Sequence, residues 1–280
     1  MKTFKLFTVA VLLTTAFSCK KTETPVTPVT PAPTVTAFSP ATGIAGDKIT
    51  ITGSNFTNAT KVSFGGTDAA SFTVKDASTI EAVLATGGAT GKVAVTTPAG
   101  SGSSTSDFTF FGVGSRFDVR GVITTNTTWK KDFVYRLRGY VYVANNVTLT
   151  IEAGTKIVSN KDSAGVLIIT PDSKIIADGT ASAPIVFTSA ETNPVSGDFG
   201  GVVIAGNAKW NGNHIVMEGG LDVKYQSFGG NNDADNSGVL RYVRIEYAGK
   251  AVNPGDEVNG LSLYAVGSGT TIDYVQISRG

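Results

Sequence analysis

Residues 231–238 have the residue types and spacing of a cation-binding loop. Asp233, Asp235 and Ser237 place oxygen ligands at alternate positions, and Gly238 follows where such a loop bends sharply. The bidentate Glu that a calcium loop carries at its twelfth position is an arginine in this sequence. Because runs of Asn, Asp and Gly also form ordinary turns, we predict an ordinary loop and keep a Ca²⁺ site as the alternative.

Acidic residues are the second group that could do chemistry. Glycan cleavage needs two carboxylates on either side of a sugar bond, or an Asp cluster that holds Ca²⁺ beside a basic proton acceptor. The carboxylates of the C-terminal half are Asp198, Glu218, Asp222, Asp233, Asp235, Glu246, Asp256 and Glu257. Their spacing singles out no pair, and carboxylates on loops are normally solvated. We therefore predict no catalytic residues.

Three aromatic residues could bind sugar rings by stacking. Trp129, Trp210 and Tyr225 each offer a flat face that suits the apolar face of a pyranose. The alternative is that they cover the ends or flanks of a hydrophobic core. His214 lies alone in an Asn- and Gly-rich loop, and we assign it no role.

Composition excludes several classes of protein. The only Cys is residue 19 and there is a single His, so an intrachain disulfide is impossible and a Cys/His zinc site is not expected. A net charge of +1 gives no basic surface for nucleic acid. Charged residues make up 16% of the chain, which also contains 33 glycines, a balance that favours short strands joined by tight turns. We expect no cofactor, apart from the possible Ca²⁺.

The N-terminus predicts export. Lys2 and Lys5 precede an apolar stretch over residues 6–17, followed by Ser18 and Cys19. This is the pattern of a secretory signal peptide, and the stretch is shorter than the roughly 20 residues of a membrane span. The segment resembles the lipobox of Bacteroidetes-type lipoproteins, which implies that residues 1–19 are a signal peptide with Cys19 as the lipidated residue. An acylated Cys19 would anchor the chain in the outer membrane, at the cell surface or on the periplasmic face.

A proline-rich tether is expected next, over residues 20–33. Prolines recur there between Thr and Val, at positions 25, 28, 31 and 33. Such a sequence favours extended polyproline II over helix. The tether would hold the following domain away from the lipid surface.

Residues 34–111 predict an immunoglobulin-like β-sandwich. Seven short apolar runs alternate with turn residues, at 35–38, 49–51, 62–64, 72–74, 80–83, 93–95 and 108–110. The segment resembles an IPT/TIG domain through Phe38-Ser39-Pro40, Gly43, Ala45-Gly46, Ile49–Gly53, Asn55-Phe56, Val62, Phe64-Gly65-Gly66, Val93–Gly100 and Phe108-Thr109-Phe110. That resemblance implies a spacer or binding module without catalytic residues.

Residues 112–280 predict a parallel β-helix. The apolar pattern of residues 149–158 recurs at 167–176, and that of residues 240–249 recurs at 272–280. Short strands that recur without amphipathic helices are typical of solenoids, in which stacked coils share one core. A second β-sandwich is the alternative.

The C-terminal segment also resembles Bacteroidetes-type surface lipoproteins with pectate-lyase-like β-helices. The resemblance is carried by residues 183–189, 200–204, 235–249 and 258–277. It supports the fold and the location only, since that family implies no settled activity. Because the resemblance runs to the last residue and nothing covers the final strand, we expect the natural chain to continue past Gly280.

Together these features predict an all-β cell-envelope lipoprotein, anchored to the membrane through its N-terminal lipid. We expect it to be a non-catalytic interaction or glycan-binding module, with polysaccharides or cell-surface proteins as partners. The alternative is a polysaccharide lyase or glycoside hydrolase of β-helix fold, with its site partly beyond residue 280.

Overall fold

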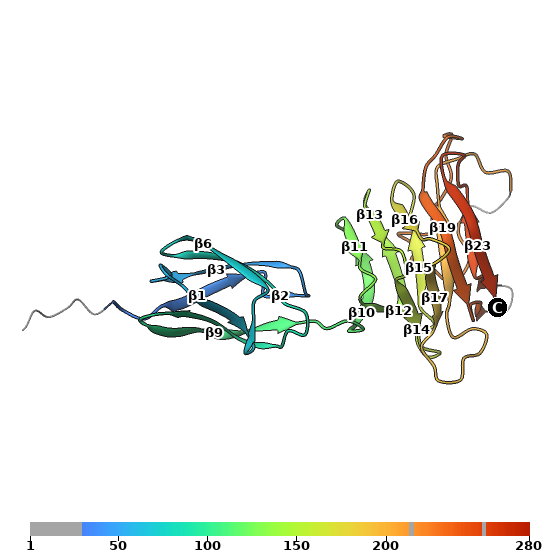
Figure 1. The fold of residues 1–280 in the computed structure, drawn as a ribbon. Helices are drawn as coiled ribbons and strands as arrows, with labels where there is room; N and C mark the ends of the chain where they lie inside the picture. Colours follow the sequence, from blue (N-terminus) through green and yellow to red (C-terminus); the bar gives the residue numbers. More distant parts are fainter. Residues whose placement is uncertain (1–29, 213–215, 254–255) are drawn as a thin grey trace, which may run out of the picture.

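The computed structural model describes residues 30–212, 216–253 and 256–280, and every regular element in these ranges is a β-strand. An Ig-like domain is followed by a stack of β-coils (Figure 1). Among the described residues, no helix has the length and apolar character that crossing a bilayer requires. The all-β fold class, an Ig-like sandwich followed by a parallel β-helix, is confirmed.

The first domain is a sandwich of two sheets. One sheet has the strand order β1 (Thr34–Ser39), β3 (Lys48–Ser54), β7 (Thr79–Val83) and β6 (Ser71–Asp76). The other has the order β2 (Thr42–Gly43), β9 (Gly100–Phe110), β8 (Gly91–Thr97), β4 (Lys61–Phe64) and β5 (Thr67–Asp68). All seven predicted strands are present, as β1, β3, β4, β6, β7, β8 and β9.

Alternation of apolar and polar residues explains how this sandwich closes. In β3, Ile49 and Ile51 are buried while Lys48 and Thr50 are exposed, as a strand with one face on a core requires. The two sheets meet over aromatic and aliphatic side chains, among them Phe56, Phe64, Phe108, Ile80 and Val93. Phe64 and Phe108 contact edge to face, with ring centroids 5.1 Å apart.

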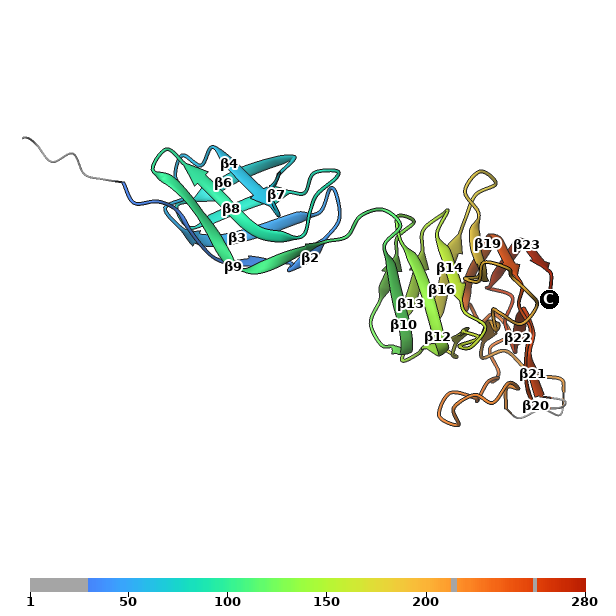
Figure 2. The same ribbon diagram turned by 90° about the horizontal axis from the view of Figure 1, so that it is seen from below.

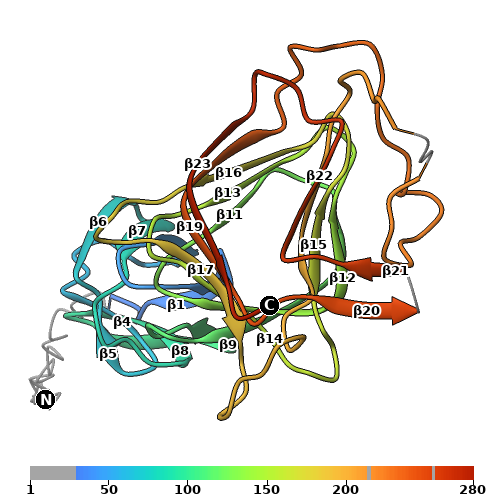
Figure 3. The ribbon, with the colours of Figure 1, turned by 90° about the vertical axis from the view of Figure 1, so that its right-hand side faces the viewer.

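The second domain winds into coils whose strands form three parallel ladders (Figure 3). The first ladder contains β11 (Thr127–Trp129), β13 (Thr148–Ile151), β16 (Lys174–Asp178) and the first parts of β19 (Gly238–Glu246) and β23 (Thr271–Ser278). The second contains the first parts of β10 (Arg116–Ile123) and β12 (Val134–Val143), then β14 (Lys156–Ser159), β17 (Ile185–Ser189) and the ends of β19 and β23. The third contains the second parts of β10 and β12, then β15 (Val166–Ile169), β18 (Gly201–Ala205) and β22 (Leu261–Tyr264).

Strands that pass from one ladder to the next bend at a residue with positive φ. Gly121 bends β10 at +69° and Gly139 bends β12 at +74°, where the absence of a Cβ removes the steric cost. Tyr242 and Tyr274 hold the same kind of bend in β19 and β23, at +49° and +50°. Their rings stack at 4.5 Å with an interplanar angle of 3°, which offsets part of the strain.

Stacked coils place aliphatic residues directly above one another at successive levels of the core. Ile151, Ala177, Leu240 and Ile272 are successive partners in the first ladder. The first three are buried, and Ile272 on the last described coil is 38% exposed. One aliphatic column therefore runs through the stack and is covered at every level but the last described one.

Each of the two sequence repeats was expected to mark strands that stack in successive coils. The strand register confirms this for one repeat and contradicts it for the other. Leu240 pairs with Ile272, as the repeat of residues 240–249 at 272–280 requires. Leu149, however, pairs with Ile175, while Leu167 pairs with Val141 in another ladder. Strands of different ladders share the same alternation of inward and outward side chains. The repeat of residues 149–158 at 167–176 therefore relates strands of two different ladders, and not strands that stack on each other in successive coils.

A long insertion between β18 and β19, described over residues 206–212 and 216–237, leaves the stack and runs outside the third ladder (Figures 2 and 3). Met217 and Leu221 from this insertion cover the outward side chains of that ladder, together with Val258 of β21 (Asp256–Val258), which pairs with β20 (Lys250–Asn253). Strands β15 and β18 are therefore buried on both faces. Their continuous apolar sequences follow from this double burial.

Candidate functional site

Turns from successive coils stack at one corner of the β-helix, between its third and first ladders. They are residues 144–147 after β12, 170–173 after β15, the insertion 206–237 after β18, and 265–270 after β22. We call this set of turns the insertion corner. It brings together the loop predicted as a possible calcium site and two of the three predicted sugar-stacking residues, Trp210 and Tyr225.

A network of hydrogen-bonded polar side chains connects the turns of this corner. Asn207 Nδ2 donates to Asp172 Oδ1 at 2.8 Å and lies 3.4 Å from Asp235 Oδ1. Ser237 Oγ donates to Asp235 Oδ2 at 3.0 Å, and the backbone N–H of Ser237 donates to Thr270 Oγ1 at 2.8 Å. The side chain of Asp235 is therefore a buried member of a hydrogen-bonded network that spans three coils.

The segment forms a loop, as predicted, but the expected exposure of its carboxylates holds for Asp233 and is wrong for Asp235. Asp235 is 7% exposed instead of solvated, because Gly206 at the start of the same insertion and Gly267 from the turn after β22 pack against it. Asp233 is two-thirds exposed and accepts a hydrogen bond from the backbone N–H of Lys209, which lowers the pKa of its carboxyl. Lys209 Nζ also lies 3.4 Å from Asp233 Oδ2. The two carboxylates thus face different partners.

Metal ligands are not gathered at this loop. Within the described ranges, no three His, Cys, Asp or Glu side chains are placed to hold one ion. Ser237, the third predicted ligand, uses its hydroxyl to donate to Asp235. These hydrogen bonds tie the turns of the corner to one another.

A hollow of about 330 Å³ lies beside Tyr225 at the start of the corner. Its polar lining comes from Asn145, Asn146, Asp172, Lys224 and Ser227. The Tyr225 ring lies 4.7 Å from that of Tyr142, and Lys224 Nζ lies 5.1 Å from the Tyr225 centroid. A sugar that stacks on Tyr225 must therefore displace the exposed Lys224 side chain.

Tyr142 fixes the insertion beneath this hollow. Its hydroxyl accepts a hydrogen bond from the backbone N–H of Asp222 at 2.9 Å. Burial raises the pKa of the Tyr142 phenol, so it stays neutral at physiological pH. The Tyr225 ring is thereby held over the third ladder.

A second hollow, of about 580 Å³, lies beside Trp210 toward the last coil. Lys209, Asn211 and Thr270 supply polar groups, and Leu263 and Ile272 supply an apolar wall. Trp210 is 39% exposed and packs edge to face on Phe228, with ring centroids 5.2 Å apart. It is the more accessible of the two aromatic platforms.

Trp129 lies elsewhere and is not available to a ligand. It is 2% exposed, and its ring stacks on Tyr135 at 4.8 Å with an interplanar angle of 14°. Its place is the first coil of the β-helix core. Trp129 therefore fits the alternative interpretation, in which an aromatic residue covers an end of the hydrophobic core.

The remaining acidic residues considered in the sequence are spread over several parts of the β-helix domain. Asp198 is fully buried between β17 and β18 and accepts hydrogen bonds from Ser189 Oγ and the Val195 N–H. Glu246 pairs with Arg244 and accepts from Thr188 within the second ladder. Glu218 and Asp222 lie on the insertion, and Asp256 and Glu257 on β21. Cys19 and His214 lie outside the described residues.

Sequence reasoning missed Asn145, Asn146 and Asp172. All three have positive φ, at 71°, 61° and 67°, in turns that follow an apolar strand. Asn and Asp tolerate this conformation better than other non-glycine residues. A turn of this kind follows both β12 and β15, and this recurrence is the feature of the sequence from which the three residues could have been identified.

Two stretches of the chain match described protein families. Residues 121–280 match the family described as pectate-lyase like beta helix domain. Residues 33–111 match the IPT/TIG domain. Both matches confirm the families that the sequence motifs indicated, and the first covers more than half of the chain. No curated protein matches.

Several solved structures are similar over part of their length. An auxiliary nutrient binding protein from Bacteroides ovatus is 19% identical over 31% of this chain and 24% of its own, with a TM-score of 0.26. One from Bacteroides thetaiotaomicron is 16% identical over 31% of this chain and 24% of its own, with a TM-score of 0.27. A structure solved with a xylogluco-oligosaccharide is 30% identical over 28% of this chain and 19% of its own, with a TM-score of 0.26. The chain spans about a quarter or less of the length of these proteins.

Proposed function

We propose that this chain, which belongs to the family of pectate-lyase-like β-helix domains, is a non-catalytic cell-envelope lipoprotein whose insertion corner binds glycans. One observation carries the proposal: two hollows at the same corner each combine an aromatic ring with amide, hydroxyl and charged side chains. Apolar sugar faces stack on such rings, while the polar groups can hydrogen-bond sugar hydroxyls. The chemistry of the lining fits carbohydrate better than a purely apolar ligand.

Geometry favours a glycan chain that runs along the coil stack. The Tyr225 hollow touches the turns after β12 and β15, and the Trp210 hollow touches the insertion and the turn after β22. At about 4.8 Å between stacked strands, these turns lie roughly 5–15 Å apart. Several linked sugar units could therefore contact both aromatic platforms.

Trp210→Ala tests the proposal. On a glycan array probed with residues 20–280, with and without Ca²⁺, we expect the wild-type chain to bind and the variant to lose at least tenfold in affinity. Removing an aromatic anchor from a binding surface costs about 2 kcal/mol, which is more than tenfold. Tyr274→Ala is the matched control, because Tyr274 is an exposed aromatic residue, 64% accessible, outside the insertion corner. Equal binding by wild type and Trp210→Ala would contradict the proposal, and release of shorter sugars would favour a lyase or hydrolase.

The lipid anchor is a separate part of the proposal. Cys19→Ala is expected to release the protein from the membrane fraction while both domains remain folded, since Cys19 precedes β1 by a proline-rich segment. Membrane fractionation measures the release, palmitate labelling measures lipidation, and circular dichroism measures the folding of the domains. Thr22→Ala is the control and should stay membrane-bound. Labelling or sedimentation of Cys19→Ala with membranes would exclude lipidation at this residue.

A further inference from the structure

The strands of the first coil of the β-helix pair with other strands on one side only. Strand β10 pairs with β12, and β11 pairs with β13. Aromatic residues fill this end of the core: Phe117, Trp129, Phe133 and Tyr135. Phe117 and Phe133 contact edge to face, with ring centroids 4.9 Å apart. A solenoid end of this kind exposes its apolar interior unless a cap covers it.

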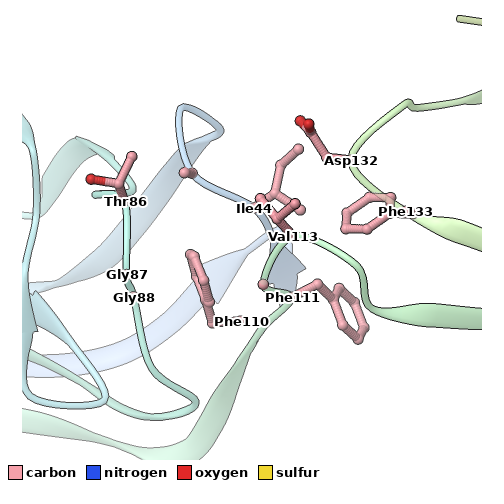
Figure 4. A pocket seen from close by; sticks show the side chains of 11 residues that line it. Ile44, Thr86, Gly87, Gly88, Phe110, Phe111, Val113, Asp132 and Phe133 are labelled. Atoms are coloured by element: carbon pink, nitrogen blue, oxygen red, sulfur yellow. The ribbon is translucent and has the colours of Figure 1, made fainter. Parts of the chain in front are cut away.

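The Ig-like domain supplies apolar side chains at that end. Phe111, which directly follows β9, lies 4.7 Å from Phe117 and 6.3 Å from Phe133, both edge to face. Ile44 from the loop after β2 also packs against the β-helix core cluster. Figure 4 shows Ile44, Phe111 and Phe133 around a cavity of about 230 Å³ between the two domains. Phe111 belongs to the β-helix cluster and not to the core of its own domain.

Polar contacts hold the same joint. Lys130 Nζ lies 3.4 Å from Asp47 Oδ1 across the two domains. In the connecting segment, the Gly114 N–H donates to the carbonyl of Asp132 at 2.6 Å. The Val134 N–H donates to the carbonyl of Ser115 at 3.0 Å. Only residues 111–115 separate β9 from β10, so these bonds fix most of the connection.

We infer that the Ig-like domain is the N-terminal cap of the β-helix, and that the β-helix depends on it to keep its first coil closed. Burial of Phe117 and Phe133 beneath Phe111 and Ile44 stabilises that coil through removal of apolar surface from water. The joint is then a fixed connection, which sets the direction of the insertion corner relative to the first domain. This role goes beyond that of a spacer or binding module.

The test uses Trp129 as a reporter of the first coil. In a Trp210→Phe background Trp129 is the only tryptophan. Phe111→Ser should raise acrylamide quenching of Trp129 at least twofold and speed amide exchange of β10 and β11 at least tenfold. Amides of β3 and β8 in the first domain should keep their protection. Val113→Ser is the matched control, because Val113 lines the same cavity two residues away but is 86% exposed, so its side chain covers little of the first coil.

A second variant keeps the test decisive if Phe111→Ser disturbs the first domain itself. Lys130→Glu places a carboxylate beside Asp47 without altering either core, and it should raise exchange of β10 and β11 at least twofold. Unchanged quenching and exchange in both variants would overturn the inference. So would faster exchange of β10 and β11 in Val113→Ser to the same extent as in Phe111→Ser.

Discussion

Gly238→Ala should unfold the β-helix domain under conditions in which the wild-type domain is stable. A Cβ at this position would lie 1.9 Å from the carbonyl oxygen of Ile175, far inside any real contact distance. The backbone φ of Gly238 is also +117°, a conformation that residues with a Cβ rarely adopt. The blocking atom is backbone of β16, so it cannot rotate aside. We expect a loss of more than about 4 kcal/mol, in the range of severe core damage.

Gly249→Ala is the matched control for backbone strain. Its φ is +106°, yet an added Cβ would meet nothing within 4 Å. This variant should lose only the strain energy, about 1–3 kcal/mol. Urea denaturation followed by circular dichroism measures both variants, and the difference between them isolates the close approach of β19 to β16. A loss in Gly238→Ala no larger than in Gly249→Ala would contradict this account.

Gly238 also shows what sequence patterns could and could not provide. Its position after Asp233, Asp235 and Ser237 matched the bend of a calcium loop, but the close approach to Ile175 explains the glycine. That approach depends on which strands stack, and the in-and-out alternation is the same in every ladder. Sequence therefore predicted the strands and the β-helix, while the register in the first coils required the three-dimensional structure.

The residues of the candidate site were likewise only partly predictable from the sequence. Residue type alone selected Trp210 and Tyr225, because a flat aromatic face suits the apolar face of a pyranose. It also selected Trp129, whose burial depends on Tyr135 in the neighbouring coil. Asn145 and Asp172 reach the Tyr225 hollow only because their turns stack beneath the insertion. No spacing along the chain encodes that meeting.

Burial of β15 and β18 on both faces was likewise hidden in the sequence. Their apolar runs predicted strands correctly, but a strand in a solenoid wall normally has one face toward solvent. The outer face here is covered by Met217 and Leu221 of the insertion. A loop sequence rich in Gly, Asn and Asp gives little sign that it packs as a second layer.

Asp235→Ala should lower the melting temperature of the β-helix domain by roughly 4–10 °C, equally in EDTA and in Ca²⁺. Removing the Asp235 carboxylate leaves the buried Ser237 hydroxyl without its acceptor and opens a gap between Gly206 and Gly267. A lost buried acceptor costs about 1–3 kcal/mol, and each kcal/mol shifts the midpoint of a domain this size by about 2–4 °C. Calorimetry of the two samples measures the shift.

Asp233→Ala provides the comparison within the same loop. Asp233 is exposed and its partner Lys209 is equally exposed, so the ion pair contributes at most about 1 kcal/mol and the variant should melt within about 4 °C of wild type. A ligand that binds only the folded state raises stability by RT ln(1 + [L]/Kd), so a calcium loop would reveal itself through a Ca²⁺-dependent rise in the wild-type midpoint. If that rise occurred and both variants abolished it, the two carboxylates would share an ion and the structural role assigned to Asp235 would be wrong. If Asp235→Ala alone is destabilised, in both buffers, the carboxylate acts as the buried acceptor that ties the insertion to the stacked turns.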